Sequence, residues 1–255
     1  MGDYRFSSSH AIPMSKNRFS NNAWDEITVA SYNIHQCLGT DNRKDLERTT
    51  RVIEELDAQL VGLQEVHSTF IQSPQVDTLT QDTGLTVIPG PTMHRSDGHY
   101  GNVLLTAYSP LSVRPIDLSF PGREPRGAID AELHIQGRSV RVIVTHLGLN
   151  ARERQFQVDQ LADRLLPQKH DLLVLMGDFN EWFPFRRQFL LLNRLLGKIS
   201  IRPTYPSRYP IFALDRIWVR PKETLRSIKT HQSSLARIAS DHLPLKARIV
   251  IDPPE

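Results

Sequence analysis

The sequence predicts an α/β fold in which two β-sheets pack face to face and helices flank them. Three observations support this prediction: two strand–helix–strand patterns, many further short β segments, and only a few segments with helical spacing. A sheet must bury a face against another layer, so many strands with few covering helices favour two packed sheets. We expect these layers to form one domain.

The first strand–helix–strand pattern lies near the N-terminus. Residues 27–35 (ITVASYNIH) alternate apolar and polar side chains, as a strand does. After a glycine-containing turn, residues 45–60 carry apolar side chains at helical spacing, namely Leu46, Ile53, Leu56 and Leu60. Residues 60–66 (LVGLQEV) form the second expected strand, and Glu65 lies near its end.

The second pattern repeats this plan. A strand in residues 140–149 ends around His146, an amphipathic helix covers residues 151–166 and stops at Pro167, and the strand LLVLMGDFN ends in Asp178 and Asn180. The polar residues at the strand ends of the first unit, His35 and Glu65, are 30 positions apart. Those of the second unit, His146 and Asp178, are 32 positions apart. Ligands of open α/β sheets collect at the carboxyl ends of strands, so both units are expected to deliver polar groups to a site.

The remaining segments alternate between strands and loops. Residues 92–101 (TMHRSDGHYG) are polar with two glycines and are expected to form a surface loop. We predict strands in 99–111, 213–219, 225–232 and 242–251, a hairpin in 127–147 that turns at Gln136–Gly137, a helix within 181–198 and a Pro-rich loop at 202–212.

Composition narrows the class of protein. The 255 residues carry 31 Lys and Arg against 28 Asp and Glu, so the net charge of +3 permits an anionic partner without indicating one. The single cysteine, Cys37, excludes a disulfide framework and fits a reducing compartment. With no apolar run of membrane-spanning length and no signal peptide, we expect a cytoplasmic protein with a flexible tail at 1–24 and one domain at 25–252.

Nine polar residues lie where predicted strands end: Asn33, His35, Glu65, His146, Asp178, Asn180, Asp215, Asp241 and His242. Four carboxylates in one site resist ionisation unless a cation joins them. Magnesium prefers carboxylate, amide and water oxygens, and neither a cysteine pair nor an HExxH stretch points to zinc. Asp178 and Asn180, two residues apart on a strand, would face the same side as an oxygen clamp, with Phe179 turned into packing.

Each of these residues also has an ordinary structural reading. Asp241 could cap a turn, Asp215 could pair with Arg216, and Glu65 could face water. A lone histidine such as His146 is more often structural than catalytic. The functional reading therefore depends on the residues occurring together.

The ordered motifs YNIH, LQEV, THL, GDFN, LDRIWV and SDH resemble the endonuclease/exonuclease/phosphatase superfamily over residues 27–251. The resemblance implies a four-layer α-β-β-α sandwich with two mixed, mostly antiparallel sheets. It also implies an enzyme that hydrolyses phosphate esters with Mg²⁺, for which Mn²⁺ could substitute. The alternatives are a catalytically silent binding protein on the same fold and an unrelated metal-binding α/β protein.

The resemblance also implies a role for each motif residue. Glu65 would be the principal metal ligand, with Asn33 close by and Asp241 completing or tuning the site. Asp178 and Asn180 would hold the attacking water, His242 would contact the scissile phosphate with Asp215 orienting it, and His146 would act near the phosphoryl oxygens. Arg126 and Asn102 are candidate substrate contacts, and so is His35.

Two residues depart from the family's nucleases: His35 stands two positions after Asn33, where abasic-site endonucleases carry an acid, and Tyr32–Asn33 stands in place of the nuclease-typical Trp-Asn. This form is more similar to bacterial relatives, some linked to lipids, and favours a lipid or small-headgroup phosphodiester over the alternative, a nuclease. The weak net charge gives no broad track for a duplex. Residues 183–198 mix Phe and Leu with Arg and Lys and could contact an anionic membrane, although such a helix more often packs on its own sheet. The sequence leaves the oligomeric state open.

Overall fold

The computed structural model describes residues 26–68, 83–96, 98–165, 170–183 and 186–251. The predicted tail at 1–24 and the predicted helix stop at Pro167 lie outside these residues. One sheet has six strands in the order β10 (Leu225–Thr230), β11 (Leu245–Val250), β1 (Glu26–Asn33), β2 (Leu60–Ser68), β4 (Gly98–Thr106) and β3 (Thr86–Arg95). The other has five, in the order β5 (Pro110–Asp117), β6 (Gly127–Ile135), β7 (Arg138–His146), β8 (Leu172–Asp178) and β9 (Asp215–Arg220).

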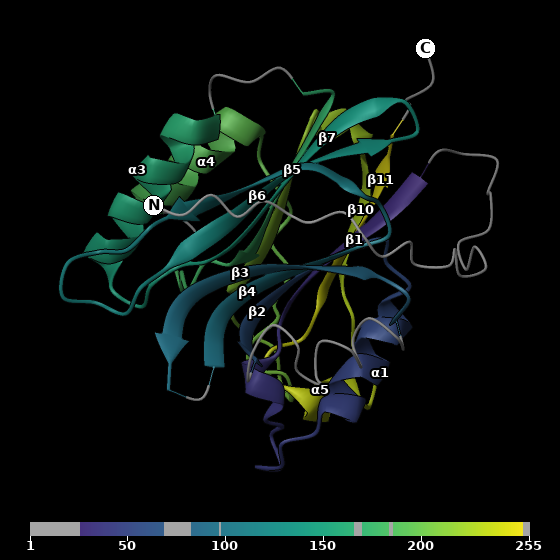
Figure 1. The fold of residues 1–255 in the computed structure, drawn as a ribbon, viewed down its shortest axis with the longest axis vertical. Helices are drawn as coiled ribbons and strands as arrows, with labels where there is room; N and C mark the ends of the chain where they lie inside the picture. Colours follow the sequence, from purple (N-terminus) through teal and green to yellow (C-terminus); the bar gives the residue numbers. More distant parts are fainter. Residues whose placement is uncertain (1–25, 69–82, 97, 166–169, 184–185, 252–255) are drawn as a thin grey trace.

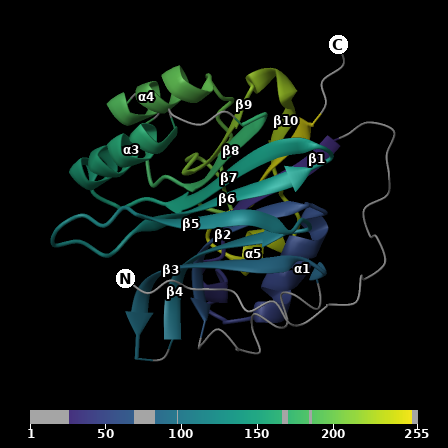
Figure 2. The same cartoon turned by 45° about the horizontal axis from the view of Figure 1, so that its top comes forward.

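The helices lie outside the two sheets, which gives the predicted four layers (Figures 1 and 2). The helices α1 (Leu46–Leu56) and α5 (Ala236–Ala239) pack on the six-stranded sheet. The helices α3 (Ala151–Leu165) and α4 (Arg187–Leu196) pack on the five-stranded sheet. The described residues also contain two short 3₁₀ turns, η1 (His35–Cys37) and η2 (Lys222–Thr224).

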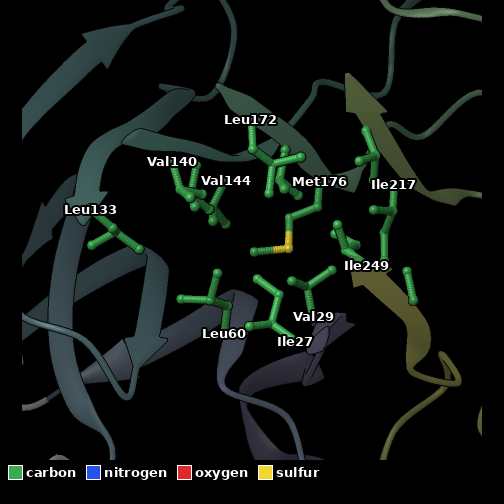
Figure 3. Packing of buried hydrophobic residues seen from close by; sticks show 14 of the residues in the cluster. Ile27, Val29, Leu60, Leu133, Val140, Val144, Leu172, Met176, Ile217 and Ile249 are labelled. Atoms are coloured by element: carbon green, nitrogen blue, oxygen red, sulfur yellow. The ribbon is translucent and has the colours of Figure 1, made fainter. Parts of the chain in front are cut away.

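The largest apolar cluster fills the space between the two sheets (Figure 3). Ile27 and Val29 of β1 and Leu60 of β2 meet Val144 of β7 and Met176 of β8 there, and all five are buried. Side chains at every second position of a strand share a face. The apolar side chains that alternate along each strand therefore form facing rows on the two sheets, and the packing of these rows fixes how the sheets lie on each other.

Both predicted strand–helix–strand units are present. In each one the two strands are parallel neighbours, β1 with β2 and β7 with β8. Antiparallel strands flank each pair on both sides, so both sheets are mixed. The predicted hairpin turns at Gln136–Gly137, where both residues have positive φ.

Several sequence interpretations were wrong, including the strand predicted to reach His35, since β1 ends at Asn33. Residues 92–101 are not a loop, because β3 runs to Arg95 and pairs antiparallel with β4 from Gly98. The ladder supplies hydrogen bonds that polar composition alone does not reveal. β3 and β5 were not anticipated as strands, and β8 ends at Asp178, two residues before the predicted end.

The amphipathic segment at 183–198 forms α4, and its apolar side faces the protein core. Phe189, Leu192 and Leu196 are buried against α3 and the five-stranded sheet. These side chains are therefore not available to a membrane. Among the described residues, none of the helices combines the length and the apolar character that crossing a bilayer requires.

Candidate active site

The candidate site lies where the rows of side chains between the sheets end. β1, β7, β8 and β9 each contribute apolar residues to the inter-sheet cluster at alternate positions. Continued by the same period of two, these rows reach Asn33, His146, Asp178 and Asp215 at one end of each strand. The sheet packing that buries the apolar residues thus also brings four polar residues to one place.

Asp178 is the centre of this group and is 1% exposed. Its Oδ2 accepts a hydrogen bond from Asn33 Nδ2 at 3.0 Å and lies 3.6 Å from Nε2 of His146 and 3.7 Å from Nε2 of His242. Its Oδ1 accepts the backbone N–H of Asn180 at 2.8 Å. One carboxylate therefore touches side chains from both sheets.

Asn180 reaches the site by a turn and not as part of a strand. Its φ is +49°, so the predicted clamp of two residues on one strand face does not form as expected. The turn closed by Asp178 Oδ1 instead directs Asn180 Nδ2 to Leu147 O at 2.9 Å and to His146 Nε2 at 3.0 Å. Phe179 is buried against Phe189 and Trp218, as the sequence indicated.

Glu65 joins the site through an irregularity in β2. The register between β2 and β4 shifts between Leu63 and Val66, and Glu65 has a φ of +57°. Its Oε1 accepts a hydrogen bond from Asn33 Nδ2 at 3.0 Å. The same amide group thus holds the carboxylates of Glu65 and Asp178 side by side. The Asn33 Oδ1 is turned away from them and accepts the backbone N–H of His35.

His242 forms the predicted pair with Asp215. Its Nδ1 lies 2.8 Å from Asp215 Oδ2, which also accepts the Thr204 hydroxyl at 2.6 Å. Burial opposes a charge on His242, but the carboxylates of Asp215 and Asp178 outweigh it and raise the pKa of His242 to about 10. His242 is therefore a cation at neutral pH.

His146, in contrast, is uncharged at neutral pH. Burial and the neighbouring Arg126 guanidinium lower the pKa of His146 to about 3, although Asp178 favours its charge. Its two ring nitrogens lie 3.1 Å from Arg126 Nη1 and 3.0 Å from Asn180 Nδ2, both of which are N–H donors. Two donors disfavour an imidazolium, which has no acceptor. One carboxylate thus stands between a neutral and a charged imidazole, and opposed pKa values of this kind mark acid and base partners.

The oxygen donors suit a hard divalent cation. Glu65 and Asp178 converge on one amide group, and carboxylate oxygens are the ligands that Mg²⁺ prefers. A second grouping, of Asp178, Asp215 and His242, has potential ligand atoms within 4.8 Å of one another. It is the poorer metal site, because His242 and Thr204 already occupy Asp215 Oδ2 and a charged imidazole repels a metal ion.

The other predicted residues border this centre. Asp241 lies 3.7 Å from His35 Nδ1, and among the described contacts none joins it directly to Glu65 or Asp178. Arg126 reaches the site through His146. Asn102 is buried, and its Nδ2 donates to the carbonyl of Gly127 at 3.0 Å, next to Arg126.

Sequence reasoning missed several supporting residues. Thr204 holds Asp215 from the Pro-rich loop, and no local motif marks it. Buried Glu181, which directly follows Asn180, pairs with Arg154 of α3 at 3.0 Å. Arg154 also donates to the carbonyls of residues 148 and 149, so this ion pair ties together the loops after β7 and β8. The position of Glu181 directly after the GDFN motif was the one sequence feature that could have indicated this ion pair.

Comparison with known proteins identifies the family and the fold. The sequence model of the "Endonuclease/Exonuclease/phosphatase family" matches residues 30–242. The chain is 29% identical over 250 residues to the uncharacterized protein YbhP of Escherichia coli K12, covering 87% of this chain and 95% of YbhP. It is similar to an endonuclease/exonuclease/phosphatase family protein of Bacteroides thetaiotaomicron (TM-score 0.70, 17% identity, 89% and 95% of the chains). It is also similar to a mannosyl-6-phosphatase of Bacteroides thetaiotaomicron (TM-score 0.68, 15% identity, 87% and 98%).

Proposed function

Because the chain belongs to the endonuclease/exonuclease/phosphatase family, whose members hydrolyse phosphate esters, we propose that it hydrolyses a phosphodiester by attack of water. The observation that carries this proposal is the placement of Asp178 between a neutral His146 and a protonated His242. Such a set can take a proton from water and supply charge to phosphoryl oxygens in one place.

Each residue has a distinct part in this proposal. Asp178 orients the attacking water and accepts its proton, with Asn180 helping to fix its position. His242, held by Asp215, donates a hydrogen bond to the scissile phosphate. His146 stays neutral and positions groups around the phosphoryl oxygens.

Glu65 and Asp178 would hold Mg²⁺, with Asn33 keeping their carboxylates together and Asp241 at the periphery. The bound ion would neutralise charge that develops on the phosphoryl oxygens. Manganese, which accepts the same oxygen ligands, is the expected substitute.

We further propose that the substrate is a lipid or a small-headgroup phosphodiester. The ring of Tyr205 lies 4.9 Å from that of His242, and Trp182 stacks edge-on with Tyr205 and Phe212. Trp182 and Phe212 are 40% and 37% exposed. This apolar rim beside His242 could receive the apolar part of a lipid, whereas the net charge of +3 gives little support to duplex binding.

A single assay panel tests both levels of the proposal. Protein stripped with a chelator is given Mg²⁺ or Mn²⁺ and offered DNA, RNA, anionic phospholipid vesicles, soluble headgroup diesters and a sugar 6-phosphate, with Asp178→Asn as the inactive control. We expect hydrolysis only with added metal, and the highest turnover on lipid or headgroup diesters. Efficient DNA cleavage without turnover of any lipid or headgroup ester would replace this substrate class by a nucleic acid.

A further inference from the structure

A pocket of about 350 Å³ opens beside the candidate active site. The Arg123 pocket, as we name it, is lined by Arg123, Glu124, Arg126, Leu149, Asn150 and Glu153. These residues come from the loop before β6, the loop after β7 and the first turn of α3.

Arg126 connects the pocket to the catalytic centre. Its Nη1 lies 3.1 Å from His146 Nδ1, and the opposite ring nitrogen of His146 lies 3.6 Å from Asp178 Oδ2. Its Nη2 lies 3.2 Å from Glu124 Oε1. The pocket is therefore separated from the central carboxylate by one guanidinium and one imidazole. A group bound there would belong to a molecule whose phosphate lies at Asp178.

The pocket contains charges of both signs. Its lining includes two guanidinium groups and two carboxylates, and Asn150 adds a carboxamide. A second phosphate would meet repulsion from Glu124 and Glu153, and a purely apolar group would leave Arg126 Nε, a buried donor with no hydrogen-bond partner, unsatisfied. A neutral group with several hydroxyls satisfies both sets, because each hydroxyl donates to a carboxylate and accepts from a guanidinium.

We propose that the Arg123 pocket binds the hydroxyl-rich headgroup of the substrate, a sugar, an inositol or a glycerol unit. This inference rests on the proposed phosphodiesterase function. The volume lies at the small end of pockets that bind small molecules, which fits one headgroup and not a polymer. Leu149, which is largely exposed, gives the pocket an apolar edge against which the carbon face of such a group can pack.

Two of the six residues also have a structural task. Asn150 Oδ1 accepts the N–H of Arg152, and Glu153 Oε2 accepts the N–H of Asn150, an arrangement that caps the start of α3. Arg123 and Glu124 are exposed and have no part in this cap. Substitutions at these two positions therefore test binding without loosening the helix.

The kinetic test compares two diesters in the same protein. Glycerophosphoinositol carries the hydroxyls, and bis(4-nitrophenyl) phosphate does not. Arg123→Ala and Glu124→Ala should lower the ratio of kcat/KM for the first over the second at least tenfold, mainly through KM. The charge-matched controls are Arg226→Ala and Glu223→Gln, exposed residues of β10 and η2, which should change the ratio less than twofold. An unchanged ratio in the pocket variants would overturn the proposal.

A binding experiment tests the proposed pocket independently of the proposed hydrolytic function. Glycerophosphoinositol, glycerophosphoglycerol, a hexose phosphodiester and diethyl phosphate are titrated calorimetrically into the inactive Asp178→Asn protein at saturating Mg²⁺. We expect a hydroxyl-bearing ligand to bind at least tenfold more tightly than diethyl phosphate, with the preference lost in Asp178→Asn/Arg123→Ala. The preferred ligand identifies the headgroup, even if no diester in the panel is hydrolysed. Equal affinity for all four ligands would exclude a hydroxyl-binding pocket.

Discussion

The two strand–helix–strand units follow one backbone plan but end differently. In the second unit (β7, α3, β8), His146 and Asp178 are direct register partners. In the first unit (β1, α1, β2), Asn33 is the partner of Gln64, and Glu65 comes one residue later with positive φ. Asn33 and Glu65 are 32 positions apart, as are His146 and Asp178, so the counterpart of His146 is Asn33 and not His35.

The connections differ as well. Only residues 147–150 join β7 to α3, and the buried Arg154–Glu181 ion pair stabilises this short connection. The first unit uses residues 34–45, which include the left-handed turn η1. Correspondingly, Asp178 is fully buried and Glu65 is half-buried. We infer that the second unit supplies fixed acid–base groups, while the first presents a carboxylate that solvent and a metal ion can reach.

The largest expected effect comes from removing the charge at each unit's carboxylate. Asp178→Asn and Glu65→Gln should each leave the fold intact and reduce kcat by roughly 10²–10⁴, the usual range for acid–base or charge-stabilising groups. Glu65→Gln should in addition raise the Mg²⁺ concentration that gives half-maximal activity more than Asp178→Asn does. Steady-state rates across a Mg²⁺ titration measure both effects.

Glu223→Gln, an exposed acid in η2, is the control for charge alone and should keep wild-type rates. Near-wild-type activity in either site variant, on the enzyme's own substrate, would remove that residue from the mechanism. Equal metal dependence in both variants would remove the proposed division between the units.

The units themselves were predictable, because alternation and helical spacing are local properties. The motif predicted where Glu65 lies in the sequence. The bulge in β2 and the hydrogen bond from Asn33 to Glu65 were not predictable, because they depend on the pairing of β2 with β4 in the folded protein. Thr204 and Arg154 could not be predicted, since their partners are distant in sequence or carry no pattern. The charge states of the two histidines likewise follow from burial and neighbours that only the packed sheets create.

His242 should make the stability of the protein depend on pH, because its pKa of about 10 lies above its ordinary value of 6.5. A raised pKa in the folded state adds stability that is fully present below pH 6.5 and is lost as the pH rises toward 10. In chelator, the stability difference between wild type and His242→Asn should therefore shrink over this window by up to about 1.4 kcal/mol per pH unit. Urea unfolding at several pH values measures it.

His146 of the second unit provides the opposite case, since its pKa is lowered to about 3. Its contribution is present above pH 6.5 and is lost as the pH falls toward 3. The difference between wild type and His146→Asn should thus shrink in acid and stay constant in alkali. Two variants with parallel curves would show that the site does not hold its histidines in different charge states.

A smaller effect is expected at Gly177, which tightens the second unit just before Asp178. Its φ is +154°, and a Cβ there would lie 1.9 Å from the Thr145 carbonyl oxygen. The corresponding position of the first unit is Leu63, where a side chain fits. Gly177→Ala should cost about 1–3 kcal/mol through backbone strain, with the contact adding to it. The control is Gly122→Ala, which has positive φ and open space around it. Equal losses in urea unfolding would show that the contact with Thr145 contributes nothing.

The smallest effect is expected at the turn that distinguishes the first unit. His35, Gln36 and Cys37 have φ values of 46°, 53° and 60°, and left-handed backbone is costly for residues other than glycine. Gln36→Gly should relieve about 1 kcal/mol of strain, part of which is offset by the greater freedom of glycine in the unfolded chain. Gln136→Gly, in the hairpin between β6 and β7, is the matched control with a φ of 50° outside the site. Urea unfolding should show a similar gain of roughly 0.5 kcal/mol for both variants. If Gln36→Gly instead loses stability while Gln136→Gly gains it, then the side chain of Gln36 stabilises the turn. The connection of the first unit would then be stabilised by side-chain contacts, as that of the second unit is.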